Sequence, residues 1–236
     1  MQIGLVSYHS KNRDVAYNLR QIERAMTAAQ GKAALLCFGE AFLQGFDSLT
    51  FDYEIDKDMA VPRDSETIAT LCKWTVQYGV ALLLGYLERE DDRIYSSCIV
   101  IDSGRIVHNY RRISEGWKEM EIADAHYCEG DRTGEFCFRD RVFMPVLCGD
   151  LWDFPERFAT KHLLVWPVYV SISKEEWEQE ALSEYAKQAA LSAPDAVMIN
   201  PIDPDNANIG GAFRFQNGRV IESIPFGKEG ILFTEI

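Results

Sequence analysis

Two side chains able to perform nucleophilic and acid–base chemistry each follow a short apolar run. Glu40 comes just after residues 34–38, and Cys148 comes directly after residues 142–147. Apolar runs of this length are typical of strands buried on both faces, and α/β folds place their ligand crevices at the carboxyl ends of such strands. A thiol at such a junction is accessible to a substrate, and a carboxylate among apolar neighbours can exchange protons near neutrality.

Gly149, next to the thiol, lets the backbone approach a substrate closely, and backbone N–H groups there can hold an oxyanion. The simpler interpretations are a glutamate that begins a helix and a buried structural cysteine. The position of Cys148 after its strand, and not within it, favours a functional thiol.

A nucleophilic site of this kind also needs a cation to stabilise the charge that develops on the substrate. Basic residues gather in residues 110–119, which follow a predicted strand. The alternative for any one of them is a solvated surface charge. None of the four histidines lies in a motif that indicates a Cys–His pair, so a carboxylate base for the thiol fits the sequence better.

Strand and helix signals alternate along the whole chain, with hairpin signals between them. Ser65 is a predicted helix cap and Gly79 a predicted helix stop, and Asn217-Gly218 is a strong tight-turn signal. Helices are expected at residues 15–29, 65–78 and 174–191, with a short one after 154–156. Strands are expected at 2–7, 34–38, 80–86, 94–101, 105–110, 142–147, 163–168, 196–200, 212–215 and 219–224.

This order predicts an α/β protein with two mixed sheets and helices outside them, each half of the chain contributing one sheet. No linker or low-complexity segment divides the sequence, so residues 1–236 are expected to form a single domain.

Composition restricts the partners. The net charge of -13 argues against nucleic acid and anionic membranes, which would be repelled. No apolar run approaches the roughly 20 residues that span a bilayer, and the first residues do not resemble a signal peptide. The six cysteines show no zinc-type spacing, and free thiols fit a reducing compartment. We therefore expect a cytoplasmic protein with no metal and no cofactor.

Motifs in the same order over nearly the whole chain resemble the nitrilase/carbon–nitrogen hydrolase superfamily. The first helix and the strand up to Glu40 are similar to the segment with the family's catalytic glutamate. Cys148-Gly149-Asp150 with Phe154-Pro155-Glu156 is similar to its Cys-x-Asp-x-x-Phe-Pro-Glu motif. Further similarities are Gly45-Phe46, Gly85, Tyr95-Ser96-Ser97, Gly104, Gly210-Gly211-Ala212 and Glu229-Gly230-Ile231-Leu232.

The resemblance implies a four-layer α-β-β-α sandwich, dimerised across its helices or forming a higher homo-oligomer. It implies that Glu40 is the general base, that Cys148 attacks an amide, carbamoyl or nitrile carbon, and that water completes the reaction. Gly149 would then contribute its N–H to the oxyanion site.

The sequence departs from the family at the expected lysine. Tyr110-Arg111-Arg112 stands where the family has Tyr-Arg-Lys, so a strict match places Arg112 at the cation position. Lys118 is the alternative, and we favour it because the site asks for a point donor and a guanidinium is not interchangeable with an ammonium. Glu119 would then be an additional carboxylate in the substrate site. The stretch after Cys148 is also one residue longer than in the family, and Gly39 replaces the usual proline before the glutamate.

Two other interpretations compete with an active hydrolase. The changed lysine motif is compatible with a catalytically idle member that binds a ligand or partner. An unrelated nucleotide-binding protein is disfavoured because the sequence has neither a GxGxxG motif nor a P-loop. Aromatic residues in the loops, among them Trp152, are expected to line a pocket for an amine-bearing or apolar acyl substrate, or else to pack in the core or at a dimer contact.

Overall fold

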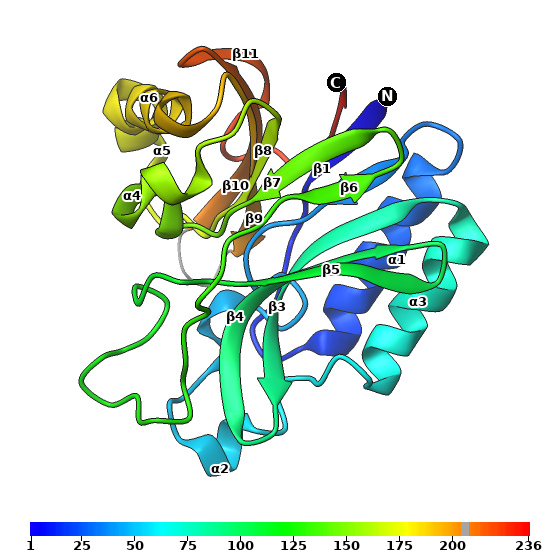
Figure 1. Cartoon of the computed structure of the whole chain (residues 1–236), viewed down its shortest axis with the longest axis vertical. Helices are drawn as coiled ribbons and strands as arrows, with labels where there is room; N and C mark the ends of the chain where they lie inside the picture. Colours follow the sequence, from blue (N-terminus) through cyan, green and yellow to red (C-terminus); the bar gives the residue numbers. More distant parts are fainter. Residues whose placement is uncertain (204–207) are drawn as a thin grey trace.

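Two six-stranded sheets form the centre of the computed structural model, which describes residues 1–203 and 208–236. The first sheet has the order β12-β1-β2-β3-β4-β5, and the second has the order β11-β10-β9-β8-β7-β6 (Figure 1). The first contains β1 (Gln2–Ser7), β2 (Leu35–Cys37), β3 (Ala81–Glu90), β4 (Arg93–Asp102), β5 (Arg105–Arg111) and β12 (Gly230–Glu235). The second contains β6 (Phe136–Phe138), β7 (Arg141–Pro145), β8 (Leu163–Pro167), β9 (Asp195–Asp203), β10 (Asn208–Gln216) and β11 (Arg219–Ile224).

Both sheets are mixed, as the alternation of helix and hairpin signals predicts. Parallel pairing joins β1, β2 and β3 in the first sheet and β7, β8 and β9 in the second. Antiparallel hairpins and the outer strands complete each sheet. The parallel strands have the functional candidates at their carboxyl ends.

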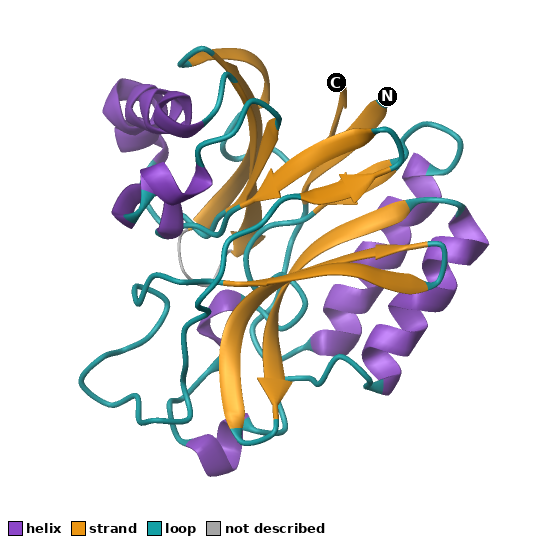
Figure 2. Cartoon of the chain, viewed as in Figure 1, coloured by secondary structure: helices purple, strands orange, loops and turns teal. Residues whose placement is uncertain are grey.

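Helices cover the outer face of each sheet, so the layers run α-β-β-α (Figure 2). The first sheet is covered by α1 (Val15–Ala29) and α3 (Glu66–Tyr78). The second is covered by α4 (Asp150–Asp153), α5 (Lys174–Glu176) and α6 (Leu182–Ser192), with a π-helical turn, η3 (Trp177–Ala181), between the last two. Shorter elements in the loops are η1 (Phe46–Ser48), α2 (Tyr53–Asp56) and η2 (Pro155–Phe158). The predicted four-layer sandwich is confirmed.

The side chains of β3 show how the sequence produces these layers. Leu82 and Leu84 pack with α1 and α3, whereas Ala81 and Leu83 point the other way, into the core between the sheets. A strand turns successive side chains to opposite faces, so a continuous apolar run serves both layers. The same inner core contains Phe143 and Trp166 of the second sheet, so the two sheets share it.

The predicted ends of α3 are confirmed in detail. The Ser65 hydroxyl accepts a hydrogen bond from the N–H of Ile68, and Gly79 ends the helix with φ of 66°. This is a left-handed conformation that glycine adopts without steric cost.

The expectation that each half of the chain builds one sheet is wrong for the last strand. β12 pairs antiparallel with β1, so the chain returns to the first sheet at its end. Ile231 and Phe233 of β12 pack towards the helices of that sheet, and Leu232 packs towards the inner core. The pairing buries an alternating apolar strand and covers the edge of β1, which would otherwise present unpaired backbone groups.

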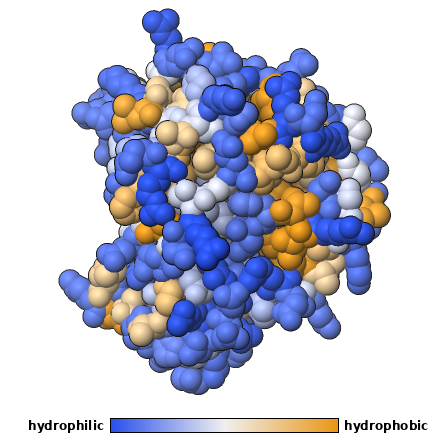
Figure 3. All heavy atoms as spheres, viewed as in Figure 1, coloured by the Kyte–Doolittle hydropathy of each residue, from blue (hydrophilic) through white to orange (hydrophobic). Residues whose placement is uncertain are grey.

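The molecular surface is mostly hydrophilic on the face shown in Figure 3, in keeping with the net charge of -13. An apolar area on this face lies over β5, where Ile106 and Val107 are exposed. None of the helices in the described part of the chain is long and apolar enough to cross a membrane.

Candidate active site

Glu40 lies in the turn that leaves β2, with its side chain fully buried. Its N–H donates to the carbonyl of Val168 at 3.2 Å. The Glu40 turn passes over the neighbouring strand β3 at Gly85. A Cβ atom on Gly85 would come within 2.3 Å of the Gly39 carbonyl oxygen and 2.7 Å of the Glu40 Cα. The glycine therefore allows the backbone around Glu40 to lie directly against β3.

Cys148 lies two residues beyond Val146 in the turn that leaves the second sheet, and its backbone φ is 39°. Non-glycine residues rarely adopt positive φ, and strain of this kind is concentrated at functional sites. The surrounding structure fixes the residue on both sides: its N–H donates to the Pro167 carbonyl at 3.0 Å, and its own carbonyl accepts from the indole of Trp166 at 2.9 Å. The thiol lies 3.8 Å from the carbonyl oxygen of Tyr169.

Arg112 lies beside Glu40, and the two side chains form a buried ion pair. The guanidinium Nη1 donates to Glu40 Oε1 at 2.8 Å, with the arginine side chain 3% exposed. The same carboxylate oxygen accepts a hydrogen bond from the Ser96 hydroxyl at 2.8 Å, while Oε2 has no hydrogen-bond partner among the described residues. Glu40 therefore has one oxygen that is fixed in place and one that can accept a proton.

Asp150 connects the nucleophile turn to the segment that carries Arg112. Its Oδ1 accepts hydrogen bonds from the N–H groups of Ile113 and Ser114, at 3.0 and 2.7 Å. Its Oδ2 accepts one from the Tyr110 hydroxyl at 2.5 Å. Because Asp150 is only two residues from Cys148, these bonds hold the cation and the thiol in register across the two sheets.

The charges of this cluster act on the thiol. Burial and the Glu40 carboxylate raise the pKa of Cys148 to about 12, against an opposing effect of Arg112. Burial would lower the pKa of Arg112, but Glu40 and Cys148 outweigh it and raise the pKa above its ordinary value. Near neutral pH the cluster therefore contains a protonated thiol and a charged guanidinium, so the sulfur could act as a nucleophile only with a base that removes its proton.

Lys118 has other partners. Its ammonium forms an ion pair with Glu129 at 2.5 Å and donates to the Tyr127 carbonyl at 3.2 Å. Glu119 is exposed, in a turn where its carbonyl accepts from the N–H groups of Ile122 and Ala123. Of the two candidate cations, Arg112 is therefore the one that contacts Glu40. The contacts of Lys118 and Glu119 are with other residues of the loop at residues 112–135.

Gly149 and Trp152 follow Cys148 closely in the chain. Gly149 is partly exposed and borders the Arg112 guanidinium. Trp152 belongs to α4, is 39% exposed, and packs edge-to-face on Tyr185 with the ring centroids 5.0 Å apart. Tyr185 also stacks on Trp166, and its pKa is raised by burial and by the proximity of Cys148. These rings form an aromatic wall beside the nucleophile.

The sequence interpretation assigned no role to Ser96, Ser114, Tyr110 or Asp150, although all four contact the site. Asp150 had a usable signal, because it belongs to the Cys-x-Asp motif. Ser96 lies in the Tyr95-Ser96-Ser97 similarity, but its contact with Glu40 exists only once separate strands are side by side, and Ser114 had no signal of its own. No group of His, Cys, Asp and Glu within residues 1–203 and 208–236 is arranged to hold a metal ion.

A two-sheet sandwich with a thiol, a carboxylate and a cation beyond the carboxyl ends of β7, β2 and β5 is the architecture expected of the nitrilase-like enzymes. Residues 2–146, which are more than half of the chain, match the family model described as carbon-nitrogen hydrolase. The chain belongs to the carbon–nitrogen hydrolase family. The matched residues include Glu40 and Arg112 and end two residues before Cys148.

A curated relative, an (R)-stereoselective amidase from Pseudomonas sp., is 30% identical over 156 residues. The match covers 66% of this chain and 54% of the relative, so the chain spans about half the length of that protein.

Solved structures share the fold over the whole chain. XC1258 from Xanthomonas campestris, a CN-hydrolase superfamily protein with an arsenic adduct in its active site, has a TM-score of 0.82 at 16% identity, covering 99% of this chain and 89% of that one. A mutant amidase from Nesterenkonia sp. AN1, with acrylamide added to its active-site cysteine, has a TM-score of 0.79 at 16% identity, covering 100% and 93% of the two chains.

Proposed function

We propose that this chain hydrolyses a non-peptide carbon–nitrogen bond of a small molecule, an amide or carbamoyl group or a nitrile, through a thioester on Cys148. The observation that carries the proposal is the convergence of Cys148, Glu40 and Arg112 at the ends of strands from two sheets. Family membership and the amidase relative support the reaction class.

Glu40 acts as the general base in the first half of the reaction. As the Cys148 sulfur attacks the carbonyl carbon, the thiol proton passes to the carboxylate, whose Oε2 has no other partner among the described residues. The tetrahedral intermediate then collapses, the carbon–nitrogen bond breaks, and the departing amine or ammonia takes the proton from Glu40. The product of this half is the acyl-thioester.

Water completes the reaction through the same carboxylate. Glu40 removes a proton from water as the oxygen attacks the thioester carbon. The carbon–sulfur bond then breaks, and the thiolate recovers the proton from Glu40 while the carboxylic acid leaves. For an amide or carbamoyl substrate this cycle adds one water across the carbon–nitrogen bond and regenerates Cys148 and Glu40. A nitrile carbon attacked by the thiol would first give a thioimidate, and an additional water would release its nitrogen as ammonia to reach the same thioester.

Arg112 and Gly149 stabilise the oxyanion in this proposal. Nη1 of Arg112 is bound to Glu40 and Nε to Ser114, whereas Nη2 forms no hydrogen bond within the described residues and lies against Gly149. The backbone N–H of Gly149 also has no acceptor within that part of the chain. These two donors can meet at an oxygen on the substrate carbon.

The cation role therefore moves from Lys118, which the sequence favours, to Arg112. The Lys118 ammonium is neutralised by Glu129, whereas Arg112 contacts the proposed base and acts electrostatically on the thiol. Lys118 and Glu119 instead belong to a loop beside the site, and Trp152 to the aromatic wall, which would face the acyl group of a substrate.

A catalytically idle member that only binds a ligand is the second candidate. The raised pKa of Cys148 and the arginine in place of lysine favour it, since a protonated thiol is a weak nucleophile unless a base acts with it. An active hydrolase should turn over a substrate, whereas an idle member should bind a ligand without turnover.

The test is a panel of small amides, carbamoyl amines and nitriles, assayed for ammonia or amine release with Cys148→Ala as the matched control. We expect turnover by the unaltered chain that Cys148→Ala abolishes, and an acyl adduct on Cys148 in rapidly quenched samples. Acrylamide offers a second probe, and we expect its adduct on Cys148 in peptide mass spectra. Ligand binding without turnover or adduct would support the idle member instead.

We propose further that the protein is a cytoplasmic homodimer or higher homo-oligomer. The six cysteines are all free thiols, which suits a reducing compartment. Leu191 on α6 is an exposed apolar side chain in the helix layer, where a second copy would contact it. Light scattering of the purified chain and of Leu191→Glu tests the oligomeric state.

A further inference from the structure

The guanidinium of Arg112 is held by more than the ion pair with Glu40. Its Nε donates to the Ser114 hydroxyl at 2.8 Å, and its Nη1 donates to Glu40 at 2.8 Å. Both Arg112 and Ser114 are buried. A planar group fixed through two of its nitrogens has a defined orientation, with the third nitrogen pointing in a fixed direction.

Gly149 lies where that third nitrogen points. A Cβ atom on Gly149 would stand 2.5 Å from Nη2, 3.2 Å from the Ser114 hydroxyl oxygen and 3.5 Å from Cζ. Gly116 borders the same nitrogen, and its Cβ would stand 3.1 Å away. Favourable contacts between non-bonded heavy atoms lie near 3.5–4.0 Å, so any side chain at position 149 would compete with the guanidinium for space.

The backbone does not itself require glycine at position 149. Its φ of -61° and ψ of -21° are those of an ordinary right-handed helix, which residues with a side chain adopt readily. The space taken by Arg112 is therefore the reason for glycine here, in contrast to the positive-φ glycines of the turns.

We propose that Gly149 and Ser114 are positioning residues that adapt this site to a guanidinium in place of an ammonium. Ser114 fixes the fork from one edge, and Gly149 leaves the volume that the larger group needs beside the nucleophile. The residues around position 112 then fit an arginine specifically, and a lysine is a poor substitute for it. The expected effect of these residues on turnover rests on the proposed function, whereas the steric fit between Arg112 and Gly149 does not.

The test is a double-variant cycle of Gly149→Ala and Arg112→Lys, followed by thermal unfolding. In the Arg112 background we expect Gly149→Ala to lower the melting temperature by about 4 °C, because the methyl group overpacks a fixed side chain. In the Arg112→Lys background, where the ammonium leaves the space open, the same change should shift it by about 1 °C or less. Gly134→Ala is the matched control, since nothing lies within 4 Å of its Cβ position.

Equal melting-temperature losses in both backgrounds would overturn the inference. If Gly149→Ala fails to fold in the unaltered background but folds when combined with Arg112→Lys, the inference is supported; if both fail, it is contradicted. This cycle is independent of turnover, so an inactive unaltered chain would refute the proposed function and leave the packing test intact.

Steady-state kinetics test the positioning role, because a purely structural role would not change kcat separately from KM. We expect Gly149→Ala to lower kcat about 100-fold, and Ser114→Ala about 10-fold with little change in KM, because a donor used in the transition state is displaced. Ser114→Thr, which keeps the hydroxyl, should recover part of kcat. A fall in kcat for Ser114→Ala that Ser114→Thr does not relieve at all would contradict a positioning role.

Discussion

The two oxygens of the Glu40 carboxylate have different surroundings. Oε1 accepts hydrogen bonds from Arg112 and Ser96, and Oε2 is buried without a partner in the described part of the chain. Leaving a buried oxygen unbonded is costly, and this exception fits the proposed use of Oε2 as the proton acceptor. The arrangement keeps the carboxylate of the proposed base in one orientation while leaving Oε2 able to accept a proton.

The pH dependence of Cys148 alkylation follows from its raised pKa. A free thiol ionises near pH 8.5, whereas Cys148 should stay protonated until about pH 12. The rate of iodoacetamide labelling of Cys148 in the absence of substrate should therefore show no inflection between pH 8 and 10. Labelling followed by peptide mass spectrometry measures the rate at Cys148 for each pH, and an inflection near pH 8.5 would contradict the buried, base-dependent thiol.

The same pKa shift has a consequence for stability. Because the folded state keeps the thiol neutral where the unfolded chain ionises, its contribution to the free energy of unfolding is constant below about pH 8.5 and falls as the pH rises above it. Cys148→Ala should therefore lose less stability than the unaltered chain between pH 8 and 10. Denaturant titrations at pH 7 and pH 10 measure the difference, and equal losses would contradict it.

Removal of the Arg112 charge should destabilise the fold as well as the reaction. Arg112→Ala leaves Glu40 as an unpaired buried carboxylate, which costs about 3–5 kcal/mol. Arg112→Lys keeps the charge and should cost less. Urea titration of both variants checks the order, and an Arg112→Ala chain as stable as the unaltered one would show that the ion pair contributes little.

At the scale of elements, the crossing of the Glu40 turn over β3 depends on Gly85. Gly85→Ala would place a methyl group against backbone atoms that cannot move aside, at a cost of about 3 kcal/mol. We expect kcat/KM to fall about 100-fold, because a displacement of about 1 Å in the base is enough for such a loss. Gly134→Ala, again the control, should leave activity unchanged; an active, stable Gly85→Ala chain would contradict the tight crossing.

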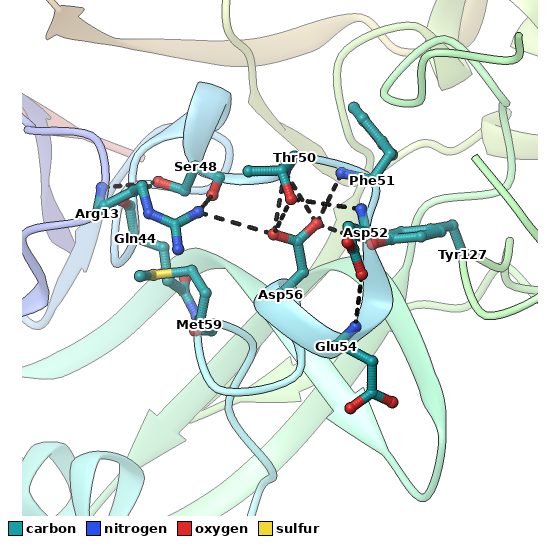
Figure 4. Close-up of polar contacts among 10 residues, drawn as sticks. All are labelled: Arg13, Gln44, Ser48, Thr50, Phe51, Asp52, Glu54, Asp56, Met59 and Tyr127. Atoms are coloured by element: carbon teal, nitrogen blue, oxygen red, sulfur yellow. Dashed lines mark hydrogen bonds and ion pairs between the residues drawn. The ribbon is translucent and has the colours of Figure 1, made fainter. Parts of the chain in front are cut away.

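The loops beside the site are joined by a buried carboxylate, Asp56 (Figure 4). Asp56 accepts hydrogen bonds from the backbone N–H groups of Thr50 and Phe51, from the Thr50 hydroxyl, and from the Tyr127 hydroxyl at 2.8 Å. Tyr127 lies in the same loop as Lys118. Asp56 therefore fastens this long loop to the segment around α2.

Substitutions at Asp56 and Tyr127 should separate the two parts of this contact. Tyr127→Phe removes one hydrogen bond and should cost about 1 kcal/mol, whereas Asp56→Ala leaves several buried donors unsatisfied and should cost about 3 kcal/mol. Hydrogen exchange of residues 112–135 should increase in both variants. Unchanged exchange there in Asp56→Ala would show that other contacts hold the loop.

Elements with strong local signals were the part of the fold that the sequence predicted best. The helix capped by Ser65 and the turn at Asn217-Gly218 have fixed local chemistry, and both appear as expected. The three-residue strand β6 was missed because so short a run has no periodicity, and the pairing of β12 with β1 depends on contacts across the length of the chain. In the site, the places of Glu40 and Cys148 after strands could be predicted, and the motif match offered Arg112 beside the favoured Lys118 as the cation. Which of the two contacts Glu40 could not be predicted, since the Arg112–Glu40 contact spans 72 residues.

At the scale of the whole molecule, one core lies between the two sheets and includes residues from both. We propose on this basis that residues 1–236 form one domain and unfold in a single transition. Calorimetric and van't Hoff enthalpies of unfolding should then agree for the chain in its purified assembly state. Two resolved transitions in the calorimetric scan would show that the sheets unfold separately.

The end of β8 anchors both halves of the proposed catalytic pair. The Pro167 carbonyl receives the N–H of Cys148, and the next carbonyl, of Val168, receives the N–H of Glu40. Two consecutive peptide groups therefore determine how far the base lies from the nucleophile, and the surrounding loops have no part in these two bonds. Sequence change in those loops can alter which acyl group is admitted while the spacing of the pair is inherited unchanged, so a scaffold of this kind can acquire new substrates without rebuilding its chemistry.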